Sequence, residues 1–241
     1  YGLVGSEMCI RDSKTPLRLT KTRLEGRVLA QTCSNGSSEM MGNLSTSLVS
    51  ILYNFQLMRL IGEDGVAAFG VIMYVNFIFI GVFMGYSIGA GPIVSYHYGA
   101  GNQEELRSLL RKSLLLMLAG CAGLTAAAVG MAFPLSRIFV SYDADLLALT
   151  ARGFRLYALS FLAMGFNIFG SAFFTALGNG VLSAAIAFLR TLLFQTAAIF
   201  VLPLFLGLDG IWLAVTAAEV LTLAVTVLFL LTQRRRYGYG G

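Results

Sequence analysis

The chain has 241 residues, of which 57% are hydrophobic and only 12% are charged, whereas soluble domains carry about 25% charged residues. This composition is typical of a membrane protein with several spans. The net charge of +5 does not indicate nucleic-acid binding, because the basic residues stand at the ends of apolar runs. Cys9, Cys33 and Cys121 have no metal-ligand spacing and predict no disulfide framework.

The first residues of the chain are not predicted to be part of the fold. Residues 1–13, YGLVGSEMCIRDS, resemble the translated read-through of a sequencing adapter, with a genuine short cytoplasmic segment as the alternative. The chain also lacks an initiator Met, so we expect it to be truncated at its front. Residues 14–38 are basic and polar and predict a cytoplasmic lead-in.

Six apolar segments follow, each long enough to cross about 30 Å of hydrocarbon as a helix of about 20 residues. Their predicted bounds are 39–61, 66–90, 109–133, 148–177, 181–203 and 210–232. The sequence therefore predicts an all-α polytopic membrane protein, with a six-helix lobe over 39–233 and a basic tail over 234–241. The second segment reaches Gly89-Ala90-Gly91-Pro92, where we expect the helix to be broken because glycine and proline lower helix stability.

The distribution of basic residues predicts the orientation of the spans. With the first span running outward, the inner segments hold 12 of the 17 Lys and Arg residues, as the excess of basic residues in cytoplasmic loops requires. The 12 are Arg11, Lys14, Arg18, Lys21, Arg23, Arg27, Arg107, Arg111, Lys112, Arg234, Arg235 and Arg236. We therefore expect a plasma (inner) membrane protein whose carboxy terminus lies in the cytoplasm.

The first span carries polar residues on one helical face. Their spacing of three or four residues places them on the same side of a helix. They are Glu39, Asn43, Ser47, Ser50 and Asn54. The stripe predicts a wet cavity in which Glu39 binds a cation or a proton. The alternative is that these small polar groups form hydrogen bonds to neighbouring helices.

The fourth span repeats this pattern with a mixture of polar, thioether and aromatic side chains. They are Tyr157, Ser160, Phe161, Met164, Asn167, Ser171 and Thr175. A cavity of this composition suits large, amphipathic and weakly specific ligands. Ordinary packing of the aromatic and methionine side chains is the alternative.

Two charged residues lie deep in the last two spans. Arg190 and Glu219 each stand nine residues from the nearer end of their span, or about 13–14 Å at the rise of an α-helix. An unpaired charge at that depth costs about 2.5–3.5 kcal/mol on insertion scales. We therefore predict that the two form an intramembrane ion pair, which serves either ion coupling or structure alone.

Nothing in the sequence predicts an enzyme. There is one His, and there is no phosphate-binding glycine motif, paired metal-ligand motif or nucleophile grouping with credible spacing. We expect no metal site and no cofactor.

Three stretches carry a resemblance to a known family. GEDGVAAFGVIMYVNFIFIGVFMGYSIGAGPIVSYHYGAGN resembles the seventh and eighth helices of the multidrug and toxic compound extrusion (MATE) transporters. RGFRLYALSFLAMGFNIFGSAFFTALGNG resembles their tenth helix and following turn, and GLDGIWLAVTAAEV resembles the opening of the twelfth. The resemblance covers about residues 25–235. It implies one of two six-helix lobes, so the partner would be the missing amino-terminal lobe.

The resemblance implies an antiporter that exports xenobiotics or organic cations by alternating access, driven by Na⁺ or H⁺. The ion-coupling candidates are Glu39, Glu219 and Arg190, and the expected partners are a cationic amphipathic small molecule and membrane lipid, with no nucleic acid. The substrate-cavity candidates are Asn43, Ser47, Asn54, Asn76, Tyr157, Met164 and Asn167. The chain departs from some members in having no carboxylate in the middle of the seventh helix or within the tenth.

Two alternatives to this function stay open. One is a related flippase of lipid-linked oligosaccharides, which would need a more cationic central cavity than one deep Arg. The other is a non-transporting membrane scaffold, which would not need several polar intramembrane stripes.

Overall fold

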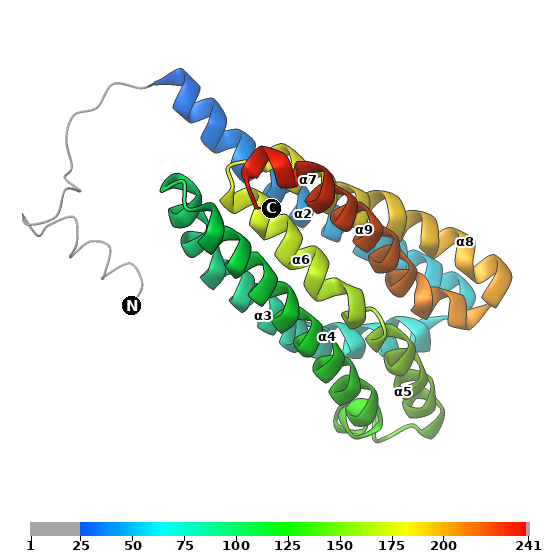
Figure 1. The fold of residues 1–241 in the computed structure, drawn as a ribbon. Coiled ribbons are helices and arrows are strands. Elements are labelled where there is room, and N and C mark those ends of the chain that lie inside the picture. Colours follow the sequence, from blue (N-terminus) through cyan, green and yellow to red (C-terminus); the bar gives the residue numbers. More distant parts are fainter. Residues whose placement is uncertain (1–24, 240–241) are drawn as a thin grey trace, which may run out of the picture. The chain divides into compact units, whose positions relative to one another are not determined.

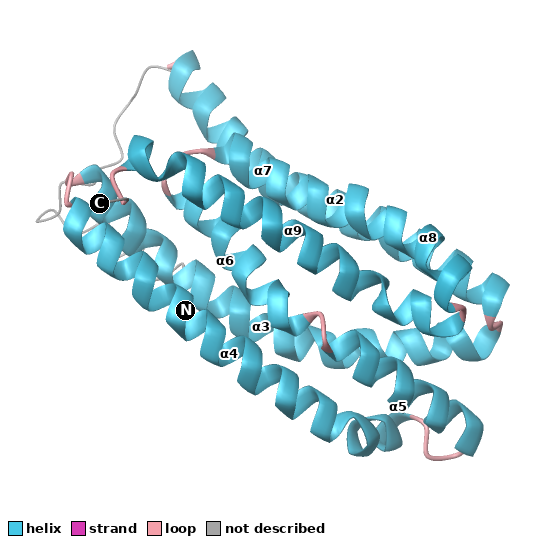
Figure 2. Cartoon of the chain, turned by 45° about the vertical axis from the view of Figure 1, so that its right-hand side comes forward, coloured by secondary structure: helices cyan, strands magenta, loops and turns pink. Residues whose placement is uncertain are grey.

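The computed structural model describes residues 25–239, except for the side chains of residues 34, 35, 37–39 and 41. Residues 1–13 and the first part of the predicted lead-in therefore lie outside the described residues. Within the described part of the chain, every regular element is a helix (Figure 2). The all-α prediction is confirmed.

The helices follow one another with short connections. Their bounds are α2 Gly26–Leu60, α3 Glu63–Gly99, α4 Gln103–Phe139, α5 Ala144–Ala158, α6 Phe161–Ala176, α7 Gly180–Phe188, the π-helix η1 Leu189–Gln195, α8 Thr196–Leu206 and α9 Leu208–Tyr237.

Side-chain caps define where three of these helices begin. The side-chain oxygens of Asn102, Asp143 and Asn179 accept hydrogen bonds from backbone N–H groups in the first turns of α4, α5 and α7. Such caps satisfy donors that have no partner inside the helix. Each capping residue therefore fixes the turn that reverses the chain.

The lengths and compositions of the helices test the predicted spans. Among the described residues, α3, α4, the continuous stretch Gly180–Leu206 and α9 are long and apolar enough to cross a membrane. The pair α5 and α6 makes a fifth span if it is counted as one. Helix α2, which carries the polar stripe, is not among them, so its membrane crossing stays a prediction.

The predicted fourth span is not one straight helix. Helices α5 and α6 are inclined to each other by 49°, and the chain bends at Leu159 and Ser160. There the amides of Leu159 and Ser160 bond to carbonyls three residues back, a local tightening of the kind seen at helix bends.

The predicted break near Pro92 is wrong. Helix α3 runs without interruption from Glu63 to Gly99 with Pro92 inside it. Proline removes only one backbone donor, whereas unwinding the helix in hydrocarbon would leave several backbone groups without water or a partner. The continuous helix therefore has the lower free energy of the two arrangements.

Helix α6 lies between the other helices of the unit formed by residues 34–241 (Figures 1 and 2). It contacts α3, α4, α7 and α9. Four of its aromatic side chains, Phe161, Phe169, Phe173 and Phe174, are fully buried, and the ring of Phe161 stacks on that of Phe79 in α3 with centroids 5.2 Å apart. Asn167, on the same helix, is likewise fully buried.

A buried polar network between α6 and α9

The network starts from Asn167 in the middle of α6. This side chain is fully buried, and its Nδ2 donates to Glu219 Oε2 at 2.7 Å and to the Glu219 backbone carbonyl at 2.9 Å. A buried carboxylate needs such donors, because removal from water otherwise disfavours it strongly. Asn167 therefore ties α6 to α9 through a charged residue.

Thr226 extends the network along α9. Its Oγ1 donates to Asn167 Oδ1 at 2.9 Å, so both ends of the amide have a partner. Gly170 makes this contact possible, since a Cβ at position 170 would lie 2.4 Å from Thr226 Cγ2. A side chain at Gly170 would push the two helices apart at the network.

Arg190 reaches the network from the π-helix η1. Its Nε lies 3.8 Å from Glu219 Oε1, so the predicted ion pair is confirmed. At this distance the contact is an ion pair without a hydrogen bond. The Arg190 side chain is 28% exposed, whereas that of Glu219 is 5% exposed. Arg190 thus stands between the buried carboxylate and the surface. It lies on a π-helix, and π-helical turns often occur at functional sites.

The acidic group of this network is the buried carboxylate of Glu219, which contacts the amide of Asn167 and the guanidinium of Arg190. Within the described part of the chain, Glu219 Oε1 makes the loose ion pair with Arg190 and no hydrogen bond. Hard cations prefer oxygen ligands such as carboxylate, amide and hydroxyl groups. Among the described residues, no cluster of three or more His, Cys, Asp or Glu residues could hold a metal ion. The amide nitrogen of Asn167 faces Glu219, and its oxygen already accepts a hydrogen bond from Thr226.

The remaining sequence-predicted site residues fall into two groups. Tyr157 and Met164 are buried, and so is Asn76, whose Oδ1 has no hydrogen-bond partner. In contrast, Asn43 and Ser47 are exposed on α2, and Ser47 donates to the carbonyl of Asn43. The structure therefore does not bring the α2 stripe together with the α6–α9 network.

Of the other three members of the α2 stripe, Ser50 is exposed. Asn54 is half-buried and donates to the Ser50 carbonyl at 2.9 Å. The side chain of Glu39 lies outside the described residues, so its role stays a prediction.

Sequence reasoning missed several polar contacts between helices. Ser171 and Thr175 of α6 meet the hydroxyl of Ser183 in α7 at 2.8 and 2.7 Å. The hydroxyl of Tyr53 in α2 donates to the Ile211 carbonyl in α9. The spacing of Ser171 and Thr175 was visible in the sequence, but nothing in it pointed to Ser183 or Ile211.

Comparison with known proteins places this architecture. The family model described as MatE matches residues 40–202, which is more than half of the chain. The chain belongs to the MatE family. The resemblance to MATE transporters is thereby confirmed, and the protein is a multi-pass membrane transporter homologue rather than an enzyme. No curated protein matches the chain.

Solved structures show the same fold. A MOP superfamily transporter from Pyrococcus furiosus is 18% identical with a TM-score of 0.88, covering 98% of this chain and 53% of its own. The bent form of the Vibrio cholerae MATE transporter VcmN is 16% identical with a TM-score of 0.87, covering 98% and 54%. An outward-facing multidrug resistance MATE transporter is 20% identical with a TM-score of 0.86, covering 94% and 51%. The chain thus spans about half the length of the MatE structures it matches.

Proposed function

We propose that this chain is the carboxy-terminal half of a cation-coupled antiporter that exports organic cations or other xenobiotics. The observation that carries the proposal is the buried network of Glu219, Asn167 and Thr226 with Arg190 at its edge. A charged residue buried in a membrane protein is costly and is retained where it serves a pathway or a coupling step. MatE membership supports transport, and the network supplies the chain's own ion-binding candidate.

In this proposal the coupling ion and Arg190 compete for Glu219. A Na⁺ ion or a proton on the carboxylate weakens its attraction to Arg190, because the net charge facing the guanidinium falls to zero. Arg190 is partly exposed and can turn outward when released. Occupancy of Glu219 would thereby change the contact between η1 and α9, which is the kind of discrete rearrangement that alternating access requires.

The substrate is assigned to the polar side of the lobe. On α2, Asn43 and Ser47 are exposed and Asn54 is half-buried, whereas Val49 and Tyr53 are buried. A second lobe opposite this polar side would enclose the polar side chains in a cavity between the lobes. Tyr157, Met164 and Asn76 are buried behind it and would meet a substrate only in another conformation of the transport cycle.

The flippase alternative fits less well. A phosphate-bearing headgroup would need an unneutralised cation deep in the cavity. Among the described residues the one deep cation, Arg190, already faces Glu219. A scaffold would have no use for a carboxylate buried this deeply, because replacing a buried ion pair with apolar residues is often neutral or stabilising.

The test uses a complete two-lobe transporter that contains this chain. Its expression should lower the accumulation of a cationic fluorescent dye when a Na⁺ or H⁺ gradient is imposed, and Glu219→Gln should abolish this effect. Glu63→Gln, which removes an exposed carboxylate at the start of α3, is the matched control and should transport normally. Undiminished gradient-driven export by Glu219→Gln at equal expression would remove Glu219 from the mechanism.

A further inference from the structure

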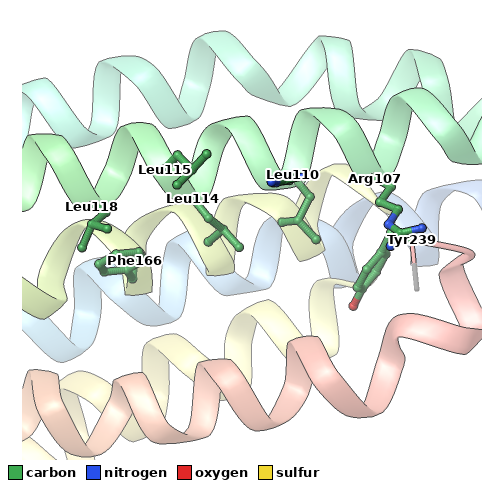
Figure 3. A pocket seen from close by; sticks show the side chains of 8 residues that line it. Arg107, Leu110, Leu114, Leu115, Leu118, Phe166 and Tyr239 are labelled. Carbon is green, nitrogen blue, oxygen red and sulfur yellow. The ribbon is translucent and has the colours of Figure 1, made fainter. Parts of the chain in front are cut away.

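A surface groove runs along α4 toward α6 and the end of the chain (Figure 3). Its volume is about 420 Å³. Four leucines of α4 and Phe166 of α6 form its apolar length, Arg107 and Tyr239 lie at one end, and Arg111 also lines it. The groove is therefore apolar along its length and cationic at one end.

The length of α4 allows the cationic end of the groove to reach the membrane surface. From Arg111 to Arg137 at the far end of α4 the helix rises about 39 Å, which matches the roughly 40–45 Å thickness of a bilayer with its headgroups. Arg111 and Arg137 are both exposed and thus bracket the span at the two headgroup layers. Leu115 and Leu118, each 57% exposed, lie between them at the depth of the acyl chains.

The two arginines of the groove have no carboxylate partner. Among the described residues neither Arg107 nor Arg111 forms a salt bridge, although Glu104 precedes Arg107 by one turn. A second groove, lined by Phe133, Ala148, Ala151, Arg152, Arg155 and Leu156, offers a comparison. There Arg152 is already paired with Asp209 at 2.5 Å. Only the first groove presents two unneutralised guanidinium groups.

Tyr239 closes the cationic end without adding negative charge. Gly238 has a φ of +76° and turns the chain back toward α4 after α9 ends, which places the Tyr239 hydroxyl on the Leu230 carbonyl. Burial, and to a lesser extent the neighbouring Tyr237, raises the pKa of the Tyr239 phenol. The phenol consequently stays neutral beside the arginines at physiological pH.

We propose that this groove binds an anionic phospholipid from the leaflet at its arginine-rich end. Arg107 and Arg111 hold the phosphate through charge-assisted hydrogen bonds, and one acyl chain lies along Leu110, Leu114 and Leu118. From Arg107 to Leu118 the helix rises about 16 Å, close to the roughly 15 Å depth of one hydrocarbon leaflet. A free phosphate would use the arginines but leave the apolar length of the groove without an occupant.

The proposal does not depend on transport and is tested by binding. The purified chain in detergent is titrated with phosphatidylglycerol and with phosphatidylcholine of the same acyl chains, and bound lipid is counted by native mass spectrometry. Two surface arginines predict about 30-fold tighter binding of phosphatidylglycerol. Arg107→Gln with Arg111→Gln should abolish the preference, whereas Arg152→Gln with Arg155→Gln in the second groove should retain it.

Two further arms identify the occupant. Leu118→Trp fills the apolar part of the groove from an exposed position and should weaken phosphatidylglycerol binding with both arginines intact. Soluble glycerol phosphate should not displace the lipid at equal concentration. The proposal would be overturned by equal binding of the two lipids or by full displacement of the lipid by glycerol phosphate. It would also be overturned if the arginines were needed for dimerisation of the chain and not for lipid binding.

Discussion

The side-chain amide of Asn167 donates to both the carboxylate and the backbone carbonyl of Glu219. A single residue of α6 therefore satisfies two acceptors on α9, one of them charged and almost fully buried. Since lipid offers these acceptors no water, the position of α9 against α6 is specified by hydrogen bonds as well as by packing. Any movement of α9 during transport must break or carry this contact.

Replacing Asn167 with Ala should destabilise the chain. The change removes both donors to Glu219 and the acceptor of Thr226, and each buried group left unsatisfied costs about 1–3 kcal/mol. We expect a clearly lower midpoint of thermal unfolding in detergent. Asn54→Ala is the matched control, because that amide bonds only to its own helix, and it should change stability by about 0.5 kcal/mol or less. Equal midpoints for the two variants would contradict the bridging role of Asn167.

The ion pair between Arg190 and Glu219 should show asymmetric single-variant effects. Arg190→Gln leaves a carboxylate that is 5% exposed, whereas Glu219→Gln leaves a guanidinium that is 28% exposed and can turn to the surface. The first change should therefore cost more unfolding free energy than the second. Combining both should cost less than their sum, with a coupling of about 0.5–3 kcal/mol. Additive losses in this double-mutant cycle would show that the two charges do not interact.

The sequence was most informative where the free-energy cost of burying a residue could be judged from that residue's own helix. The depth of Arg190 and Glu219 could be counted along their own spans, and the cost of an isolated charge in lipid then required a partner. The partner of Asn167 could not be found in this way, because the packing of α6 on α9 brings together residues 52 positions apart. Helical spacing marked Asn167 as one of a polar stripe without indicating which neighbour the stripe faced.

Helix-propensity rules derived in water failed at Pro92, where the alternative to a helix is an unwound backbone in hydrocarbon and not one in water. Pro92 predicts a helix break in water, yet α3 continues through it because an unwound backbone has no solvent in hydrocarbon. The stripe on α2 was correctly placed on one face by its spacing. No contact within the described residues covers that face. The polarity of Asn43 and Ser47 therefore indicates a cavity, but it does not identify the residues on the other side of that cavity.

The close approach at Gly170 offers the sharpest test of the network. Gly170→Ala places a Cβ 2.4 Å from Thr226 Cγ2, which should separate α6 from α9, weaken the bonds of Asn167 and lower the unfolding midpoint. Overpacking of this kind costs about 1–3 kcal/mol. Thr226→Ser removes the clashing methyl group but keeps the hydroxyl that donates to Asn167. The double variant should therefore recover most of the lost stability, whereas Thr226→Val, which keeps the methyl group and lacks the donor, should not. Failure of serine to rescue Gly170→Ala would mean that contacts other than Thr226 limit the approach of the two helices.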